Sequence, residues 1–208
     1  MVIDLQLDSL ELIKATKSDL DRLSTLAIHA FKNYPMWIHF FPNEEKRIKK
    51  GILAFKSVIA YGLNYGYCYY LPEYKGMILY FTSKHAPMSI WGLIRTGALR
   101  TLGAGLHFLS ESSKIDNIII DRHHRVIKNG HVYLQMLAVD ALHQNKKLGS
   151  RVLKPFLEMC DKVQMPVFLE THDPKNVPRY EHFGFTLMDT FPLLETGITN
   201  FAMLRNNK

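Results

Sequence analysis

The segment 131–185 constrains the fold most, because strand-like and helix-like patterns alternate in it around one short polar loop. The apolar run His131–Val139 has the length and composition of a central β-strand whose end is buried on both faces. Apolar residues then recur at helical spacing over Gly149–Lys162, and Pro166–Thr171 predicts a second strand. A strand, a helix and a further strand in this order form a unit with parallel strands. The segment therefore predicts an α/β domain.

The polar loop Gln144–Gly149 joins the first of these strands to the helix. The first N–H groups of a helix have no backbone partner, and the helix dipole places partial positive charge there. Lys146 and Lys147 add two cations at the same place. The loop therefore predicts a site for a phosphate-like anion, although an exposed polar turn with solvated lysines has the same local sequence.

The remainder of the chain supplies further strands and helices for the same sheet. In chain order the patterns predict a short strand at Glu11–Ala15, a helix that begins at Ser18 with Asp21 in the capping-box position and ends at Tyr34-Pro35, a second helix capped by Asn43, a hairpin of Tyr67–Leu71 and Gly76–Thr82, a short helix at Lys175–His182, and two last strands at Gly184–Thr190 and Thr199–Arg205.

A helical insertion, Pro87–Ile127, separates the hairpin from the central strand and is expected in two pieces, since Gly103 and Gly105 weaken its continuity. It is either a cover for a substrate or a pair of packing helices. The fold class is thus an α/β layered domain, in which helices flank a mixed central sheet. We expect one domain over residues 1–208, with the insertion at about 87–127 and a ligand-binding core at 130–190.

The motifs of the second half resemble the GNAT superfamily of N-acetyltransferases. The resemblance is carried by Val139, Gln144, Gly149, Pro155, Leu169-Glu170-Thr171, Asn176, Tyr180 and Gly184-Phe185. It implies the acyl-CoA N-acyltransferase fold and acetyl-CoA as co-substrate. Asn145 and Lys147 depart from the pattern, because they stand where the family usually has glycine. Asn reaches the left-handed conformation at low cost, and we expect Lys147 to keep an ordinary turn.

The resemblance also implies which residues bind the co-substrate. The pantetheine arm is expected between Leu137–Val139 and the strand that ends at Thr171, two parallel strands that must separate to admit it. The Val139 N–H is expected to hold the thioester carbonyl, and Asn176 to bind the arm or to cap a helix. The full set of expected binding residues is Leu137, Ala138, Val139, Gln144, Asn145, Lys146, Lys147, Leu148, Gly149, Ser150, Asn176 and Tyr180.

The resemblance implies which residue is the general acid, but it does not identify the general base. Tyr180 matches the tyrosine that protonates the departing thiolate, and its alternative is a packing residue. Many relatives carry a glutamate on the central strand, where this chain has Gln135, which cannot accept a proton. His131, Glu170 or a group acting through water remain as candidate bases.

The function expected is acetyl-CoA-dependent N-acetylation by direct transfer to a primary amine, on a small molecule or a peptide. One alternative is a non-catalytic acyl-CoA-binding sensor with the same fold. Another is a nucleic-acid-binding module, which the net charge of +7 favours and the scattered lysines and arginines do not.

Other features exclude further classes. His123-His124 with Asp121 lack the spacing of three metal ligands, so no metal is expected. Cys68 and Cys160 are expected as buried thiols, which suits a cytoplasmic protein. The apolar stretch 87–109 is interrupted by charged residues and glycines, so we expect no membrane span. A homodimer is left open.

Overall fold

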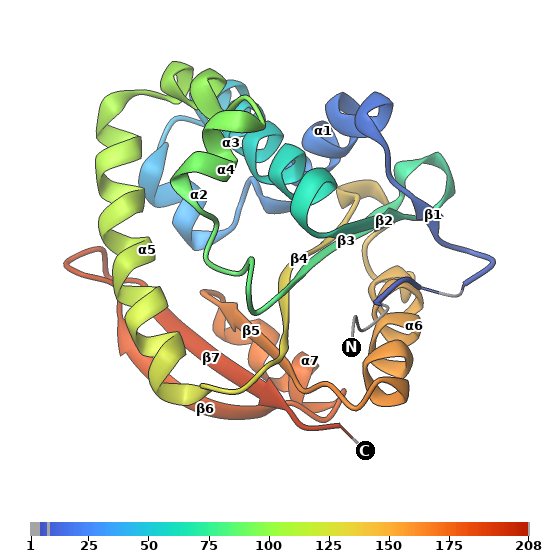
Figure 1. The fold of residues 1–208 in the computed structure, drawn as a ribbon. Helices are drawn as coiled ribbons and strands as arrows, with labels where there is room; N and C mark the ends of the chain where they lie inside the picture. The colour runs from blue at the N-terminus through green and yellow to red at the C-terminus, as the bar shows by residue number, and fades with distance from the viewer. Residues whose placement is uncertain (1–4, 8, 208) are drawn as a thin grey trace.

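The structure is a computed structural model and describes residues 5–7 and 9–207. Among these residues one mixed sheet of seven strands has the order β1-β2-β3-β4-β5-β7-β6 (Figure 1). β4 and β5 run parallel, and the other neighbouring strands run antiparallel. The strands are β1 (Ile13–Lys14), β2 (Tyr67–Tyr70), β3 (Gly76–Thr82), β4 (Val132–Val139), β5 (Val167–Thr171), β6 (Thr186–Pro192) and β7 (Thr199–Arg205). The expected α/β class with a mixed central sheet is confirmed.

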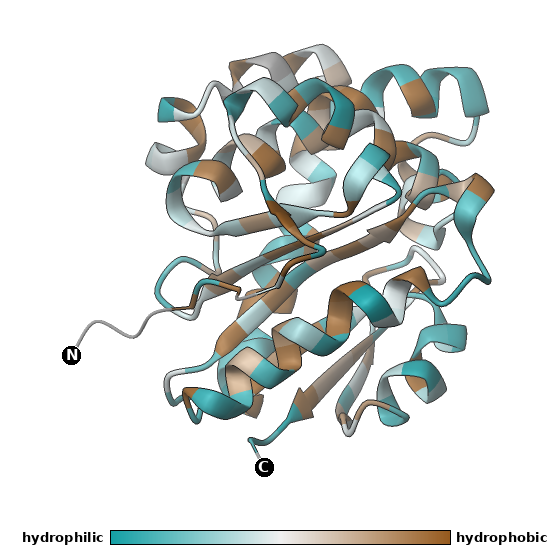
Figure 2. Ribbon diagram, turned by 90° about the vertical axis from the view of Figure 1, so that its right-hand side faces the viewer, coloured by the Kyte–Doolittle hydropathy of each residue, from teal (hydrophilic) through white to brown (hydrophobic). Residues whose placement is uncertain are grey.

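Helices cover both faces of this sheet. They are α1 (Leu20–Phe31), α2 (Pro35–Phe40), α3 (Glu44–Tyr65), α4 (Ile90–Arg95), α5 (Leu106–Val126), α6 (Leu148–Lys162) and α7 (Val177–Glu181). α1 and α3 pack on one face and α6 packs on the other. Figure 2 shows hydrophobic residues concentrated in the strands and along the helix sides that meet them. The residues expected inward on α6 are indeed buried: Val152, Leu153, Phe156, Leu157 and Cys160.

Two helix starts show how local sequence sets the boundaries. Asn43 caps α3 as expected, because its side-chain oxygen accepts the Lys46 N–H at 2.9 Å. The expected start at Ser18 is wrong. Thr16 caps a 3₁₀ turn (Lys17–Asp19) that leads into α1, and its N–H donates to Asp19 Oδ2 at 2.8 Å. This reciprocal box satisfies the first N–H groups two residues earlier than the Ser18–Asp21 pair would.

The insertion is helical, but in three segments rather than two. α4 is followed by a 3₁₀ helix (Ala98–Ala104) and then by α5. The chain reverses at Gly97 and Gly105, whose φ angles of 87° and 109° favour glycine. The 3₁₀ helix packs on α3, and α5 packs against β6 and β7. α5 is therefore part of the sheet's cover (Figure 1).

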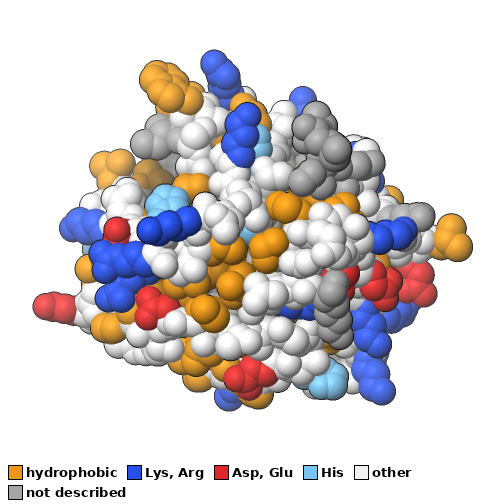
Figure 3. All heavy atoms as spheres, turned by 60° about the horizontal axis from the view of Figure 1, so that its bottom comes forward, with side chains coloured by type: hydrophobic (Ala, Val, Ile, Leu, Met, Phe, Trp, Pro, Cys, Tyr) orange, Lys and Arg blue, Asp and Glu red, His pale blue; other side chains and the backbone are white. Residues whose placement is uncertain are grey.

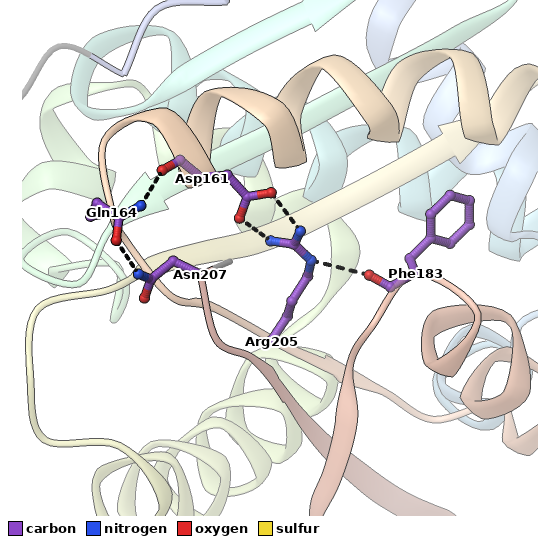
Figure 4. A network of polar contacts seen from close by, with 5 residues as sticks. All are labelled: Asp161, Gln164, Phe183, Arg205 and Asn207. Carbon is purple, nitrogen blue, oxygen red and sulfur yellow. Dashed lines mark hydrogen bonds and ion pairs between the residues drawn. The ribbon is translucent and has the colours of Figure 1, made fainter.

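A buried ion pair fastens the C-terminal strands to α6 (Figure 4). Arg205 on β7 donates to both carboxylate oxygens of Asp161, at 2.8 and 2.7 Å, and its Nε donates to the Phe183 carbonyl at 3.1 Å. A bidentate pair of this kind fixes geometry as well as charge. It holds the turn between α7 and β6 against the end of α6, and so positions the segment that carries Tyr180.

None of the described helices is both long enough and apolar enough to cross a bilayer.

Candidate active site

An opening between the parallel strands β4 and β5 is the central feature of the site. The two strands pair at Val132–Val167 and Tyr133–Phe168, and no further pairing follows along either strand. The expected separation of these strands is therefore confirmed. Beyond Tyr133, the β4 edge that faces β5 presents backbone groups without a strand partner. An unpaired strand edge binds an extended amide-bearing ligand as an added strand.

A β-bulge in β4 gives the physical reason for the opening. On the β3 side, Leu79 lies opposite Met136 and Tyr80 lies opposite Leu134, so Gln135 has no residue opposite it. A bulge bends its strand and increases the local twist. This one comes two residues after the last pair with β5, so β4 turns away from β5 there.

The backbone of β4 also determines which N–H groups face the opening. The Asp140 N–H donates to the Lys75 carbonyl on the β3 side, at 3.0 Å. Consecutive residues of a strand direct their N–H groups to opposite edges. The N–H groups of Val139 and Leu137 therefore point into the opening.

The loop after β4 has two residues in the left-handed conformation. Asn145 has a φ of 63° and Lys147 has a φ of 58°. The expectation of an ordinary turn at Lys147 is wrong, because the chain must enter α6 there and the helix start overrides the residue's preference. A non-glycine residue pays on the order of 1–2 kcal/mol for this conformation. Strain held in a loop of this kind is common where a backbone approaches a ligand.

The start of α6 is free to bind an anion. Lys147 is the N-cap residue and its side chain makes no capping hydrogen bond, which leaves the N–H groups of Leu148–Ser150 without that partner. At Gly149 a Cβ would meet its nearest neighbour, a methyl of Val139, at 3.8 Å. The protein's own packing therefore leaves room for a larger residue than glycine at this position.

One side chain of the loop, Gln144, is hydrogen-bonded to the protein, whereas Lys146 and Lys147 extend into solvent. Gln144 Nε2 donates weakly to the Val139 carbonyl, at 3.4 Å, and so holds the loop against the end of β4. Lys146 and Lys147 are exposed, and neither forms an ion pair within the described part of the chain.

Glu170 lies across the opening, on β5. The Tyr133 hydroxyl donates to its Oε2 at 2.7 Å. Burial and the nearby Asp116 carboxylate raise the pKa of Glu170 to about 8, against the lowering effect of the Tyr133 hydrogen bond. A carboxyl group with a pKa near neutrality suits proton transfer.

The end of β5 holds a second set of polar groups together. Thr171 Oγ1 lies 3.0 Å from the Tyr34 hydroxyl and accepts a hydrogen bond of 3.0 Å from Asn176 Nδ2. Arg179 donates to the other side of the Asn176 amide at 3.2 Å. Asn176 is at the N-cap position of α7, yet its side chain makes no cap, so the capping interpretation is wrong.

Tyr180 stands on α7 beside this group. Its ring contacts Phe185 edge-on, with centroids 5.5 Å apart, and packs against the core beneath α6. Burial, with the nearby Tyr34, raises the pKa of the Tyr180 hydroxyl above its usual range. The phenol therefore keeps its proton throughout the neutral range.

His131 is not brought to the opening. It precedes β4, about 26 Å along the strand from Val139 at ~3.3 Å per residue. It is 4% exposed, its Nε2 lies 2.8 Å from Nε2 of His123, and its Nδ1 lies 2.8 Å from the Asn129 carbonyl. Burial lowers its pKa. The structure gives His131 a place in the core and no contact with the other predicted residues.

The expected buried thiols are confirmed. Cys68 and Cys160 are free and buried, and burial raises the pKa of each to about 12. Within residues 5–7 and 9–207 no three His, Cys, Asp or Glu side chains gather as metal ligands.

The unpaired edge of β4 at Leu137–Val139 thus borders the opening on one side, and β5, which carries Glu170, borders it on the other. Sequence reasoning missed Tyr133, which hydrogen-bonds Glu170, Tyr34, which lies against Thr171, and Asp116, whose charge raises the pKa of Glu170. The local sequence around each of these residues indicates its secondary structure, but not which residues it lies near in the folded chain.

Comparisons with known proteins agree with this geometry. A family model described as an acetyltransferase (GNAT) domain matches residues 106–205. An uncharacterised N-acetyltransferase of Schizosaccharomyces pombe is 33% identical over 61 residues, and this match spans 29% of the chain and a quarter (25%) of the relative's length.

Solved structures match nearly the whole chain. One from Corynebacterium glutamicum, described as a histone acetyltransferase and related acetyltransferase, has a TM-score of 0.68 at 16% identity, covering 95% of this chain and 96% of that one. The C-terminal condensation domain of Ebony, in complex with beta-alanyl-dopamine, has a TM-score of 0.63 at 11% identity, covering 97% and 100%. At these identities the likeness shows the fold. The family model makes residues 106–205 of this chain similar to an acetyltransferase (GNAT) domain, and the solved structures show that the whole chain has the fold of such proteins.

Proposed function

We propose that this chain transfers the acetyl group of acetyl-CoA directly to a primary amine. The observation that carries the proposal is the opening between β4 and β5, which leads to an uncapped helix start with two unpaired lysines. A long ligand with amides at one end and phosphates at the other fits such an arrangement.

Acetyl-CoA would be held by the free edge of β4 and by the loop that follows this strand. The N–H groups of Leu148–Ser150, with Lys146 and Lys147, suit the diphosphate. The free edge of β4 at Leu137–Val139 suits the pantetheine amides, and Asn176, which is hydrogen-bonded to Thr171 at the end of β5, would bind the arm from the other side. The Val139 N–H, which points into the opening, is the donor for the thioester carbonyl oxygen.

Glu170 and Tyr180 would carry the proton transfers. Glu170 takes a proton from the ammonium group of the acceptor, and the neutral nitrogen then adds to the thioester carbonyl carbon. As the C–S bond breaks, the Tyr180 hydroxyl gives its proton to the departing sulfur, and the proton that the attached nitrogen then loses returns to the Tyr180 oxygen, which leaves an amide, free CoA and protonated Glu170. The thiols support direct transfer, since both cysteines are buried with a pKa raised to about 12 and so offer no thiolate nucleophile.

Two alternatives remain testable. A sensor with the same fold would bind acetyl-CoA and acetylate none of a broad panel of amines. A nucleic-acid-binding module is disfavoured by the face drawn in Figure 3, where lysine and arginine side chains form separate groups and those at its left and right edges have acidic side chains beside them. Binding of polynucleotides with a steep salt dependence would support the second alternative.

CoA and acetyl-CoA should raise the melting temperature, because they bind the folded chain alone. At a concentration one hundred times the Kd the gain is about 2.7 kcal/mol, which corresponds to roughly 5–10 °C for a chain of this size. Differential scanning fluorimetry measures it, with ATP as a control that carries phosphates without the pantetheine arm. No shift at millimolar acetyl-CoA would contradict the proposed co-substrate site.

The double variant Lys146→Ala/Lys147→Ala should bind CoA on the order of tenfold more weakly, because charge-assisted contacts to phosphate contribute about 1.5–3 kcal/mol each where they are fully formed and less on an exposed loop. Melting without ligand should hardly change. Isothermal titration calorimetry measures the Kd, with Lys154→Ala, exposed on the middle of α6, as the matched control. Equal affinity in all three proteins would show that the two lysines are merely solvated.

A further inference from the structure

Helix α5 of the insertion brings one of its carboxylates over the proposed site. Asp116, Ile120 and His123 follow one another at spacings of four and three, so they share a face of the helix. His123 stacks on Phe168 of β5, with ring centroids 4.2 Å apart and 9° between the planes. Phe168 and Glu170 point to the same face of β5 because strand side chains alternate.

The direction of α5 places Asp116 toward Glu170. The helix ends near the start of β4 and β5, so its earlier turns lie over the later part of β5 (Figure 1). Seven residues separate Asp116 from His123, about 10 Å along the helix axis. Glu170 lies two residues beyond Phe168, about 7 Å along the strand. The Asp116 carboxylate is close enough to raise the pKa of Glu170.

No fixed positive charge of the described protein balances these two carboxyl groups. Neither forms an ion pair among the described residues. Burial lowers the pKa of His123 to about 3 and that of His172 to about 4, so the histidines beside Glu170 on this face are neutral. The Asp116 side chain is exposed to solvent, and desolvation by the neighbouring protein raises its pKa to about 6.

Glu170 also has an unused acceptor. Its Oε2 accepts from Tyr133, whereas its Oε1 is enclosed and has no hydrogen-bond partner among the described residues. An enclosed oxygen without a donor costs free energy in the unliganded protein. A ligand N–H would satisfy it.

We propose that the acceptor is a diamine or polyamine, whose reacting amine meets Glu170 while a second ammonium group binds Asp116 on α5. This inference rests on the proposed acetyltransferase function and assigns its substrate class. Asp116 acts as a specificity-determining residue, because it binds a part of the acceptor that does not react. The insertion then supplies the charge that selects acceptors with two cationic ends.

The test compares two acceptors of equal chain length, cadaverine and pentylamine. Cadaverine has two equivalent amines, so statistics alone give it a twofold advantage. With Asp116 engaged, its kcat/KM should exceed that of pentylamine at least tenfold beyond this factor, about 1.4 kcal/mol. The advantage should lie in KM, since the second ammonium is bound equally in the ground state and the transition state.

Asp116→Asn should reduce the ratio toward two. Because Asp116 also raises the pKa of Glu170, both amines are compared above pH 8, where that change acts on them equally. The control Asp121→Asn, which loses a carboxylate of the same helix that pairs with Arg125 at 2.6 Å, should keep the parent ratio. A thermal shift with CoA checks that both variants fold and bind the co-substrate.

A ratio near two in the parent, or an unchanged ratio in Asp116→Asn, would overturn the inference. If pentylamine is still acetylated when one of these results is found, the proposed acetyltransferase function is retained and only the substrate class is wrong. Failure of the function itself has a different signature, in which neither amine is acetylated and acetyl-CoA produces no thermal shift.

Discussion

Glu170→Gln is expected to lower kcat/KM for amine acetylation by roughly 10²–10⁴-fold, the usual range for loss of a general base. Glutamine keeps the size of the side chain and can still hydrogen-bond with Tyr133, but it cannot take the proton of the acceptor. Free-thiol release from acetyl-CoA measures the rate. Glu181→Gln, exposed on α7, is the matched control and should behave as the parent.

The pH profile separates a base from a structural carboxyl group. Since the pKa of Glu170 is about 8, kcat/KM of the parent should rise up to about pH 8 and level off above it. In the Glu170→Gln variant, the rise of kcat/KM toward pH 8 should be absent. Tyr133→Phe should move this rise to higher pH, because the Tyr133 hydrogen bond lowers the pKa of Glu170. A Gln variant with the parent's rate and profile would assign the base to another group.

Stability gives an independent readout of the same carboxyl group. Between its ordinary pKa of 4.5 and its folded value of about 8, Glu170 is protonated in the folded chain and ionised in the unfolded chain. The folded state then binds more protons, so this group's contribution to the free energy of unfolding falls as pH rises across that window. Glutamine does not ionise, so its contribution to the free energy of unfolding does not fall as pH rises. The Gln variant should therefore gain in melting temperature relative to the parent from pH 5 to pH 9.

Local patterns predicted the strands and helices well where one face is uniformly apolar. Strand β4 and helix α6 follow their predicted ranges within one residue, because burial imposes a period of two or of 3.6. The cap at Asn43 was predictable because the interaction lies within four residues. The left-handed Lys147 was not, since the required direction of entry into α6 overrode the residue's preference.

The site was predictable only in part, because its two sides are joined by register and packing. The bulge at Gln135 depends on the register between β3 and β4, and the sequence of either strand alone does not determine that register. Asp116, whose charge raises the pKa of Glu170, lies in an insertion that has no motif of its own. Conversely, His131 directly precedes the correct strand, but at the end away from the opening, a distinction that depends on where β5 separates from β4. The roles of Glu170 and Tyr180 remain predictions.

Tyr180→Phe is expected to lower kcat and kcat/KM together by roughly 10²–10⁴-fold, because it removes a proton donor used in the transition state. Phenylalanine keeps the edge-on contact with Phe185, so CoA affinity and melting temperature should hardly change. Burial keeps the parent hydroxyl protonated, so the loss should be the same at every pH in the neutral range.

The acyl donor distinguishes an acid from a packing residue at this position. If Tyr180 protonates the departing sulfur, a thioester with a more acidic thiol needs that proton less. The gap between parent and variant should then narrow with such a donor, relative to acetyl-CoA. A tyrosine that only packs predicts no dependence on the leaving group, and a variant that turns over acetyl-CoA at close to the parent rate. Either of those results would remove Tyr180 from the chemistry and leave the sulfur to depart unaided.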